Sequence, residues 1–271
     1  MTAERVAVVT GAGRGMGREV ARRLIDRGWT VVVTDIDETA AKSTAADLGD
    51  RGQSMQHDVR DPAAHRAVAS YAASIGPVTA WINNAGILRT GTLWEQDDAT
   101  MSTTLDINLL GVMHGTRAAL ELMRTHGKPA DIINMASMSA FGPIPGLAAY
   151  AASKAGVLSW TLTTATELDA VGSLIHVHAV CPDGVRTDMV AENADNSGSA
   201  MIFSGKLLDA GTVADAIVGL LGTNQLILSI PRHRAFAARL TAIAPRVALP
   251  LIRMTAALGE RNRRRAQTSN T

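Results

Sequence analysis

Residues 6–17 read VAVVTGAGRGMG, and this stretch decides the fold. A short apolar run leads directly into a turn with glycine at positions 11, 13, 15 and 17. Glycines let the chain turn sharply and let its backbone approach a phosphate, and a following helix points its positive N-terminal end at that phosphate. A glycine cluster alone is a weak signal, but one between a strand and a helix predicts a dinucleotide-binding loop. An ordinary tight turn is the alternative.

The rest of the chain repeats this alternation of short apolar runs and stretches of helical length. We predict strands at residues 5–10, 29–34, 53–57, 78–83, 130–136, 174–181 and 225–230. We predict helices near residues 15–27, 37–48, 61–75, 97–126, 147–171 and 212–222. Strands that alternate with helices and are almost continuously apolar form a parallel sheet buried on both faces. The predicted fold class is α/β, a Rossmann-like doubly wound parallel sheet with helices on both faces and a helical C-terminal extension.

The chain shows no linker rich in proline, glycine or serine and no internal repeat. We therefore expect one catalytic domain over residues 1–230 and a basic helical extension over residues 231–271, packed on that domain. Residues 188–211 are polar and irregular, which predicts a mobile loop.

Composition narrows the class of protein. The 271 residues are 46% hydrophobic and 19% charged, which excludes a disordered chain. Cys181 is the only cysteine, so an intrachain disulfide and a CxxC metal or redox motif are excluded. No apolar run approaches the roughly 18 residues of a membrane-spanning helix, and the N-terminus does not resemble a signal peptide. A cytoplasmic location is expected.

Asp35 ends the second predicted strand, 18 residues after Gly17. A carboxylate there accepts hydrogen bonds from the adenosine ribose and repels a 2′-phosphate, whereas Arg14 beside the loop would attract that phosphate. An unpaired like-charge contact costs several kcal/mol, and a partly exposed arginine contributes roughly 1 kcal/mol. This comparison favours NAD over NADP. A helix N-cap or turn residue is the alternative interpretation of Asp35.

Tyr150 and Lys154 lie four residues apart, which places both on one face of a helix. A tyrosine with a pKa near 10 must lose roughly 3 pKa units to act as an acid or base near neutrality. A nearby ammonium favours the phenolate and would lower the pKa in this way. Ser137, at the end of a predicted strand, could hydrogen-bond a substrate oxygen. A buried tyrosine and a solvated lysine are the alternatives.

These motifs together resemble the short-chain dehydrogenase/reductase family, of the type with a TGxxxGxG loop and a YxxxK pair. The motifs with counterparts in the family are residues 10–17, Asp58-Val59, Asn83-Asn84-Ala85-Gly86, Asn108, Ser137 and Tyr150 to Lys154. They occur in the family's order and span about two-thirds of the chain, which makes the resemblance specific.

The resemblance implies a mechanism of hydride transfer between a nicotinamide and a substrate carbon. Tyr150 would exchange a proton with the substrate oxygen, and Ser137 would orient that oxygen. Lys154 would lower the tyrosine pKa and bind the nicotinamide ribose, and Asn108 would hold a water that links Lys154 to solvent. The expected dinucleotide contacts are Gly11, Gly13, Arg14, Gly15, Met16, Gly17, Asp35, Ile36, Asp58, Val59, Asn84, Ala85, Gly86, Tyr150, Lys154, Pro182, Val185 and Thr187.

The sequence departs from the family pattern in two places. Asp183 replaces the glycine of the usual Pro-Gly pair after the sixth strand, which leaves the backbone path between Pro182 and Val185 open. The last strand lacks the usual Val-Asp-Gly-Gly-like turn and continues into the extension. The oligomeric state is therefore open between a homodimer, formed through the helices at 97–126 and 147–171, and a homotetramer.

The C-terminal extension concentrates positive charge. Residues 231–271 contain nine arginines and one acid, Glu260, whereas residues 1–230 contain 17 bases and 24 acids. Pro245 and Pro250 predict two short helices rather than one long helix. Apolar residues between the arginines favour packing on the domain or a subunit contact, and leave a peripheral membrane contact as an alternative. No nucleic-acid partner is expected, because the arginines are not interleaved with aromatic residues.

We therefore expect an NAD-dependent oxidoreductase that interconverts a lipophilic secondary alcohol and its ketone. The expected substrate pocket is formed by Trp94, Ser139, Phe141, Ile144, Leu147 and Met189. A reductase of carrier- or CoA-bound 3-oxoacyl groups and a non-catalytic dinucleotide-sensing regulator are the alternatives. His176 and His178 lie on one side of a strand without a third nearby ligand, so no metal site is expected.

Overall fold

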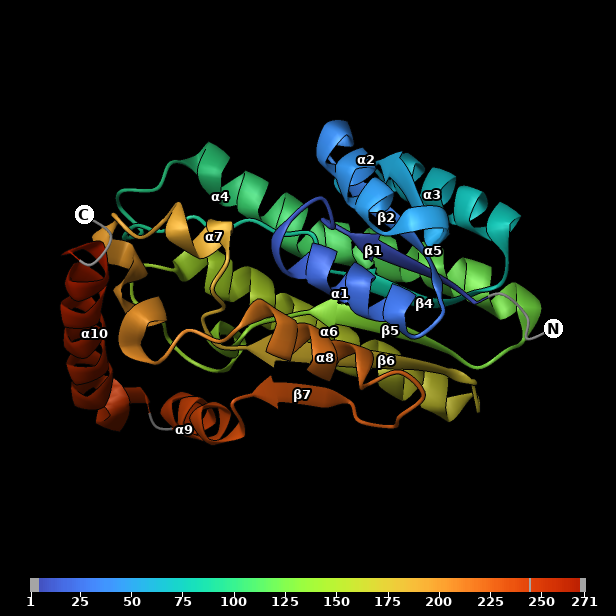
Figure 1. The fold of residues 1–271 in the computed structure, drawn as a ribbon. Helices are drawn as coiled ribbons and strands as arrows, with labels where there is room; N and C mark the ends of the chain where they lie inside the picture. Colours follow the sequence, from blue (N-terminus) through green and yellow to red (C-terminus); the bar gives the residue numbers. More distant parts are fainter. Residues whose placement is uncertain (1–4, 244, 269–271) are drawn as a thin grey trace.

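The protein forms a three-layered α/β structure around one parallel sheet (Figure 1). The structure, a computed structural model, describes residues 5–243 and 245–268. The seven strands lie in the order β3-β2-β1-β4-β5-β6-β7. Their bounds are β1 Val6–Thr10, β2 Thr30–Asp35, β3 Gly52–Gln56, β4 Val78–Asn83, β5 Ala130–Met135, β6 Ile175–Pro182 and β7 Ile227–Ile230. The predicted fold class is confirmed, and the strand order reverses between β1 and β4, where such sheets bind ligands.

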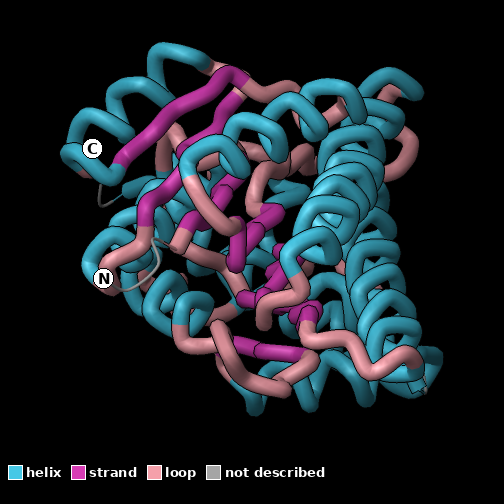
Figure 2. The backbone as a smooth tube through the Cα atoms, turned by 90° about the vertical axis from the view of Figure 1, so that its right-hand side faces the viewer, coloured by secondary structure: helices cyan, strands magenta, loops and turns pink. Residues whose placement is uncertain are grey.

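The strands inside the sheet are largely apolar because helices cover both faces of the sheet (Figure 2), whereas the edge strand β3, with sequence GQSMQ, is more polar and only partly buried. In β1, Ala7 and Val9 pack into one buried cluster, and Val6 and Val8 pack into another on the opposite face. This alternation follows from the two-residue period of a strand. The helices that follow the strands of the nucleotide half are α1 Gly15–Asp26, α2 Glu38–Asp47, the short 3-10 turn η1 Gly49–Arg51, and α3 Pro62–Ile75.

The helix predicted at 97–126 contains an irregular turn in its middle. It consists of α4 Asp98–Leu105, the π-helical turn η2 Asp106–Leu110, and α5 Gly111–His126. Single π-turns inside helices occur often at functional sites, and this one contains the buried Asn108. The helix predicted at 147–171 is continuous as α6 Ala148–Ala170, and the 3-10 turn η3 Met138–Phe141 precedes it.

The segment expected to be an irregular loop contains ordered helical turns instead. These are α7 Asp188–Ala191 and the 3-10 helix η4 Ser197–Ser204, which α8 Ala210–Val218 follows. Helix α10 of the extension packs along η4. The two segments approach closely because α10 has glycine at position 259, where a Cβ atom would overlap the carbonyl oxygen of Ala200. This packing explains why the polar sequence of 188–211 is folded.

The extension forms two helices, α9 Arg232–Ile243 and α10 Pro245–Thr268. Two helices were predicted, but the prediction that both are short is wrong, because α10 has 24 residues and includes Pro250. Pro250 is exposed and stands near the start of the helix, so it removes one early hydrogen bond. The later turns are held by the buried side of α10, which includes Ile252 and Arg263.

Candidate active site

A cavity of about 740 Å³ lies at the carboxyl ends of the central strands. It is lined by residues from the glycine loop, from the ends of β4, β5 and β6, and from α6. All the expected dinucleotide contacts except Gly13 therefore face one continuous space with the expected catalytic pair. Such a crevice is the usual ligand site of open parallel sheets.

The glycine loop has the geometry that a phosphate cradle needs. Gly11 and Gly15 adopt left-handed backbone angles, with φ of 61° and 57°. A Cβ atom at position 17 would overlap the carbonyl oxygen of Gly11, so α1 can begin this close to the loop only with glycine there. Asn84 Nδ2 donates hydrogen bonds to the carbonyl oxygens of Thr10 and Gly11, at 2.9 and 3.0 Å, and fixes the loop to the end of β4. These residues fit a bound pyrophosphate.

The acidic residue at the end of β2 faces the loop as expected. Asp35 Oδ2 accepts a hydrogen bond from the Gly13 N–H at 3.0 Å, and Asp35 lines the cavity with Ile36. Gly13 itself is absent from the cavity lining among the described residues, because it packs against Asp35 and Ala40. Its role in the structure is to place the carboxylate.

Two charged residues of the expected dinucleotide site, Arg14 and Asp58, have partners within the protein. Arg14 Nη1 lies 2.8 Å from Glu192 Oε1, just after α7, and this hydrogen bond raises the pKa of the arginine. Asp58 lies 2.6 Å from Arg60, and that hydrogen bond lowers the pKa of the carboxyl. Arg14 is thus neutralised by a nearby carboxylate, which weakens its attraction for a 2′-phosphate.

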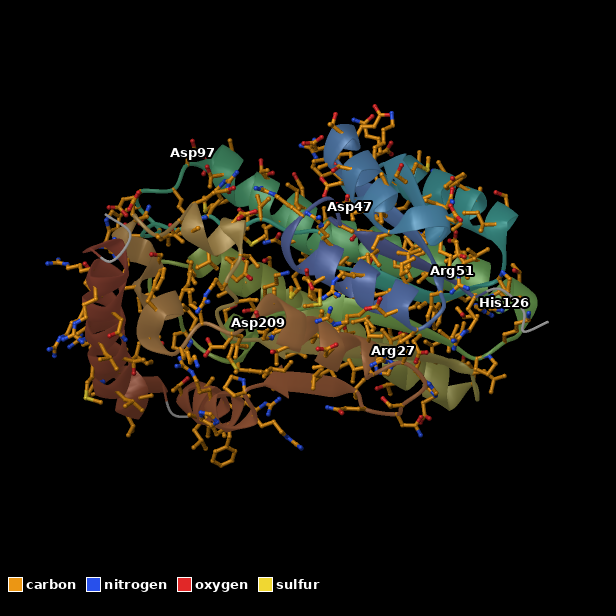
Figure 3. The ribbon with its side chains drawn as sticks, viewed as in Figure 1. Arg27, Asp47, Arg51, Asp97, His126 and Asp209 are labelled. Carbon is orange, nitrogen blue, oxygen red and sulfur yellow. The ribbon has the colours of Figure 1, made fainter. Side chains whose placement is uncertain are left out.

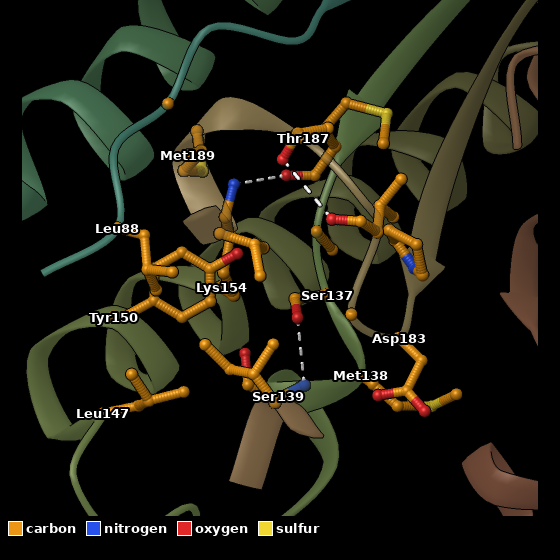
Figure 4. Close-up of a pocket in the computed structure, with 18 of the residues that line it drawn as sticks. Leu88, Ser137, Met138, Ser139, Leu147, Tyr150, Lys154, Asp183, Thr187 and Met189 are labelled. Carbon is orange, nitrogen blue, oxygen red and sulfur yellow. Dashed lines mark hydrogen bonds between the residues drawn. The ribbon is translucent and has the colours of Figure 1, made fainter. Parts of the chain in front are cut away.

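Ser137, Tyr150 and Lys154 converge on the cavity, as Figure 4 shows. Ser137 lies two residues after the end of β5, and the other two residues lie one helical turn apart on α6. The Ser137 hydroxyl lies close enough to Tyr150 to favour its ionised form. Lys154 Nζ donates a hydrogen bond to the carbonyl oxygen of Met135 at 2.7 Å and lies 5.7 Å from the centre of the Tyr150 ring.

Burial shifts the pKa values of both members of the catalytic pair. It raises the pKa of Tyr150, and the neighbouring Ser137 hydroxyl lowers it by less. Burial also lowers the pKa of Lys154 to about 8. The net direction for the phenol is opposite to the predicted depression, because burial disfavours the charged phenolate. The effect of the lysine on the tyrosine pKa remains a prediction.

Asn108 lies beside the catalytic pair but does not line the cavity. Its side chain is fully buried, accepts a hydrogen bond from the Ile87 N–H and donates one to the Ile87 carbonyl, both at 2.8 Å. A Cβ atom at position 86 would lie 3.1 Å from Asn108 Oδ1 and 3.7 Å from Lys154 Nζ. Asn108 thus fixes the segment after β4 next to Lys154, and the expected water remains a prediction.

The structure places four of the six expected substrate residues in the cavity lining: Ser139, Ile144, Leu147 and Met189. The other two lie elsewhere. Phe141 is buried in a core cluster beneath Arg239, whose guanidinium carbon lies 4.1 Å from the ring centre. Trp94 is 86% exposed and is not among the residues that line the cavity. Their expected contacts with substrate are corrected accordingly.

The extension supplies a wall of the cavity, which the sequence did not predict. The lining residues from α9 and α10 are His233, Arg234, Ala237, Ala238, Thr241, Leu251, Ile252 and Thr255. One feature of the sequence pointed to this wall: Asp183 replaces the glycine that the family usually has at this position. A carboxylate that is buried there needs a basic side chain as its partner.

That partner is Arg234 in α9. Arg234 Nε lies 2.7 Å from Asp183 Oδ2, and Arg234 Nη2 donates a hydrogen bond to Ser204 Oγ at 2.7 Å. Burial raises the pKa of Asp183, and Arg234 opposes this rise. The backbone after Asp183 stays regular, because Leu208 pairs with Val185 in a parallel bridge. Val185 and Thr187 consequently line the cavity as expected.

The two histidines of β6 lie beside Asp131 of the neighbouring strand β5. His178 Nε2 lies 3.1 Å from Asp131 Oδ1, and His176 Nδ1 lies 3.8 Å from the same oxygen. Within the described part of the chain, no group of three His, Cys, Asp or Glu side chains could hold a metal ion.

Comparisons with known proteins agree with this geometry. The short chain dehydrogenase family matches residues 5–198. The chain is 37% identical to a 3-beta-hydroxysteroid dehydrogenase of Comamonas testosteroni over 187 residues, which are 69% of this chain and 73% of that protein. It is 32% identical to the 3-oxoacyl-[acyl-carrier-protein] reductase FabG of Escherichia coli, covering 80% of this chain and 89% of FabG.

A solved structure extends the likeness beyond the sequence match. A short-chain dehydrogenase/reductase from Burkholderia phymatum in complex with NAD superimposes with a TM-score of 0.82 at 27% identity, covering 90% of this chain and 95% of the other. The glycine loop, the YxxxK pair and the family match together identify the chain as a member of the short-chain dehydrogenase/reductase family of oxidoreductases.

Proposed function

We propose that the protein is an NAD-dependent oxidoreductase that interconverts a lipophilic secondary alcohol and its ketone. The observation that carries this proposal is the single cavity that joins the glycine loop to Ser137, Tyr150 and Lys154. Its outer part is lined by apolar side chains such as Ile144, Leu147 and Met189, which suit a lipophilic substrate.

Each catalytic group has a defined task in this proposal. Tyr150 takes a proton from the alcohol oxygen or returns it to the ketone oxygen. Ser137 donates a hydrogen bond to the same oxygen and stabilises the charge that develops there. Lys154 contacts the nicotinamide ribose and provides positive charge near the phenol. When bound, the dinucleotide supplies the centre that accepts or donates the hydride.

The preference for NAD rests on two observations. Asp35 places a carboxylate in the cavity where the adenosine ribose would lie, and a 2′-phosphate beside it would be repelled. Arg14, which would offset that repulsion, is already paired with Glu192. Steady-state kinetics with NAD and NADP side by side test this preference, and faster turnover with NADP would overturn it.

The chain offers a matched control for the catalytic assignment, since Tyr71 is its only other tyrosine. Tyr150→Phe should lower turnover at least about a hundredfold and leave NADH binding intact. Tyr71 lies on α3, where its hydroxyl donates a hydrogen bond to Gln53 Oε1 at 3.2 Å, so Tyr71→Phe should retain full turnover. Unchanged activity of Tyr150→Phe would refute the mechanism. Failure of the wild-type protein to turn over any alcohol or ketone while binding NADH would favour a dinucleotide-sensing regulator.

A second candidate function has an observation in its favour. Ser139 Oγ is buried at the cavity wall and has no hydrogen-bond partner among the described residues. A buried hydroxyl of this kind is stabilised by a polar group of the substrate, such as the second carbonyl of a 3-oxoacyl thioester. A simple ketone lacks that carbonyl. A Ser139→Ala variant that loses activity selectively on 3-oxoacyl substrates would support this alternative.

We further propose a homodimer formed through α4, α5 and α6. Leu105, at the end of α4, and Leu110, in the π-helical turn η2, are 37% and 42% exposed, and such an interface would cover both side chains. Sedimentation velocity of the wild type and of Leu105→Ser/Leu110→Ser tests the interface. A homotetramer would show that a further surface takes part.

A further inference from the structure

Helix α10 has two faces of opposite character. Its inner face, which includes Ile252 and Gly259, is buried against the domain. Its outer face bears what we call the α10 stripe, whose members are separated by three or four residues and so lie along one side of the helix. The stripe consists of Val247, Leu251, Met254 and Leu258, which are 81%, 51%, 65% and 50% exposed.

Positive charge follows the stripe along its length. Arg246 and Arg253 each precede a stripe residue, Arg261 follows the last one by three positions, and all three are exposed. The acid of this helix, Glu260, is already engaged, because its carboxylate lies 2.8 Å from Arg263 and 2.7 Å from Arg264. The outer face of α10 therefore combines exposed apolar side chains with a row of cations.

This combination identifies the partner by its chemistry. A second copy docked on the same face by a two-fold axis would bring the arginines of both chains together, with Glu260 as the acid of each α10. An anionic lipid surface satisfies both features, since its acyl boundary takes the apolar stripe and its headgroups neutralise the arginines. We propose that α10 docks the protein in the plane of an anionic membrane surface.

The arrangement of the extension supports docking in the plane rather than insertion. No helix in the described residues is long and apolar enough to cross a membrane. Figure 1 shows α10 along one edge of the molecule, at the opposite end from the helix ends of α3 and α5. On α9, Phe236, Leu240 and Ile243 form another exposed apolar line, which ends at the last residue of that helix. Leu251 lines the cavity as well as the outer face, so docking would bring the cavity wall to the lipid.

The experiment is sedimentation of the full chain with vesicles of phosphatidylcholine alone and of phosphatidylcholine mixed equally with phosphatidylglycerol. The wild type should bind only the mixed vesicles. Arg246→Gln/Arg253→Gln/Arg261→Gln should weaken that binding on the order of a hundredfold at about 0.1 M salt, where the Debye length is about 10 Å. The matched control removes three exposed arginines that lie outside the extension, as Arg51→Gln/Arg66→Gln/Arg124→Gln, and should bind almost as the wild type does. Figure 3 shows Arg51 at the opposite end of the molecule from α10, and salt screens charges at such a distance.

A second variant tests whether the apolar α10 stripe contributes to lipid binding, and whether a second copy of the chain covers the stripe instead. Met254→Ser/Leu258→Ser should also weaken binding to mixed vesicles and leave the sedimentation coefficient in solution unchanged. The proposal is overturned if the wild type does not bind mixed vesicles, or if the tail triple variant and its control bind them equally. It is also overturned if the serine variant changes the oligomeric state in solution. Thermal unfolding shows that each variant is folded, and sedimentation does not depend on turnover.

Discussion

Separating the Asp183–Arg234 ion pair should release the wall that the extension adds to the active site. The pair joins the end of β6 to α9, and its side chains are only 13% and 29% exposed. Gly205 leaves the room that the guanidinium occupies, since a Cβ atom there would overlap Arg234. The contact therefore depends on three separate segments of the chain: the end of β6, helix α9 and the segment that contains Gly205.

The two single substitutions of the ion pair should lower the unfolding free energy by unequal amounts. Arg234→Ala leaves a nearly buried carboxylate without its cation, which we expect to cost about 3 kcal/mol of unfolding free energy, at the low end for buried pairs. Asp183→Ala costs about 1 kcal/mol, because Arg234 keeps its hydrogen bond to Ser204 and some access to solvent. The double variant should cost about 2 kcal/mol, which corresponds to a coupling energy of about 2 kcal/mol.

Urea unfolding of the four proteins measures this cycle, and the Michaelis constant for a bulky ketone reports on the wall. Arg234→Ala should raise that constant more than the constant for a small ketone, because Arg234 lines the cavity. Arg232→Ala, an exposed arginine of the same helix, serves as the control and should change stability by less than about 0.5 kcal/mol. If the double variant lost as much stability as the two single variants combined, the pair would not be coupled and the reasoning would be refuted.

Three further predictions address cofactor choice, acid stability and the packing of α10. Asp35→Asn keeps the hydrogen-bond acceptor for Gly13 and removes the charge, so the NADP-to-NAD ratio of kcat/KM should rise about a hundredfold; an unchanged ratio would contradict this. Burial lowers the pKa of His65 from 6.5 to about 4, so the unfolded chain takes up a proton below pH 6.5 that the folded protein refuses. Stability should therefore fall as the pH drops from 6.5 towards 4, and His65→Gln should reduce that slope by about 1.4 kcal/mol per pH unit in urea unfolding. Gly259→Val should lower the melting temperature, because its side chain would overlap the carbonyl of Ala200, and an unaltered melting curve would show that α10 does not pack there.

Much of the fold and of the catalytic group follows from local patterns. The strands inside the sheet were predictable because a buried parallel strand is a nearly continuous apolar run, and the bounds of β1, for example, differ by one residue from those predicted. Ser137 and the glycine loop meet because the carboxyl ends of parallel strands share one edge of the sheet. Tyr150 and Lys154 face the same cavity because four residues make about one turn of α6.

The remaining features depend on contacts between distant segments. The pKa of Tyr150 is set by burial, which its neighbours in the sequence do not reveal. Phe141 turns to the core because Arg239 from the extension covers it. The wall formed by α9 and α10 needs close approaches at glycines such as Gly142, where a Cβ atom would overlap Thr241. The sequence shows where a glycine allows a close approach, but not which distant segment packs against it.

The part of the site that binds the cofactor and the outer wall of the cavity come from different stretches of the chain. The sheet and the glycine loop are complete at Ile230, and the helices that wall the outer cavity follow it. Exchange of the segment after Ile230 between relatives would therefore alter which substrates fit and leave the cofactor crevice unchanged. Substrate range and cofactor use can therefore be changed separately, provided that the new segment supplies a basic partner for Asp183 or that Asp183 is replaced with it.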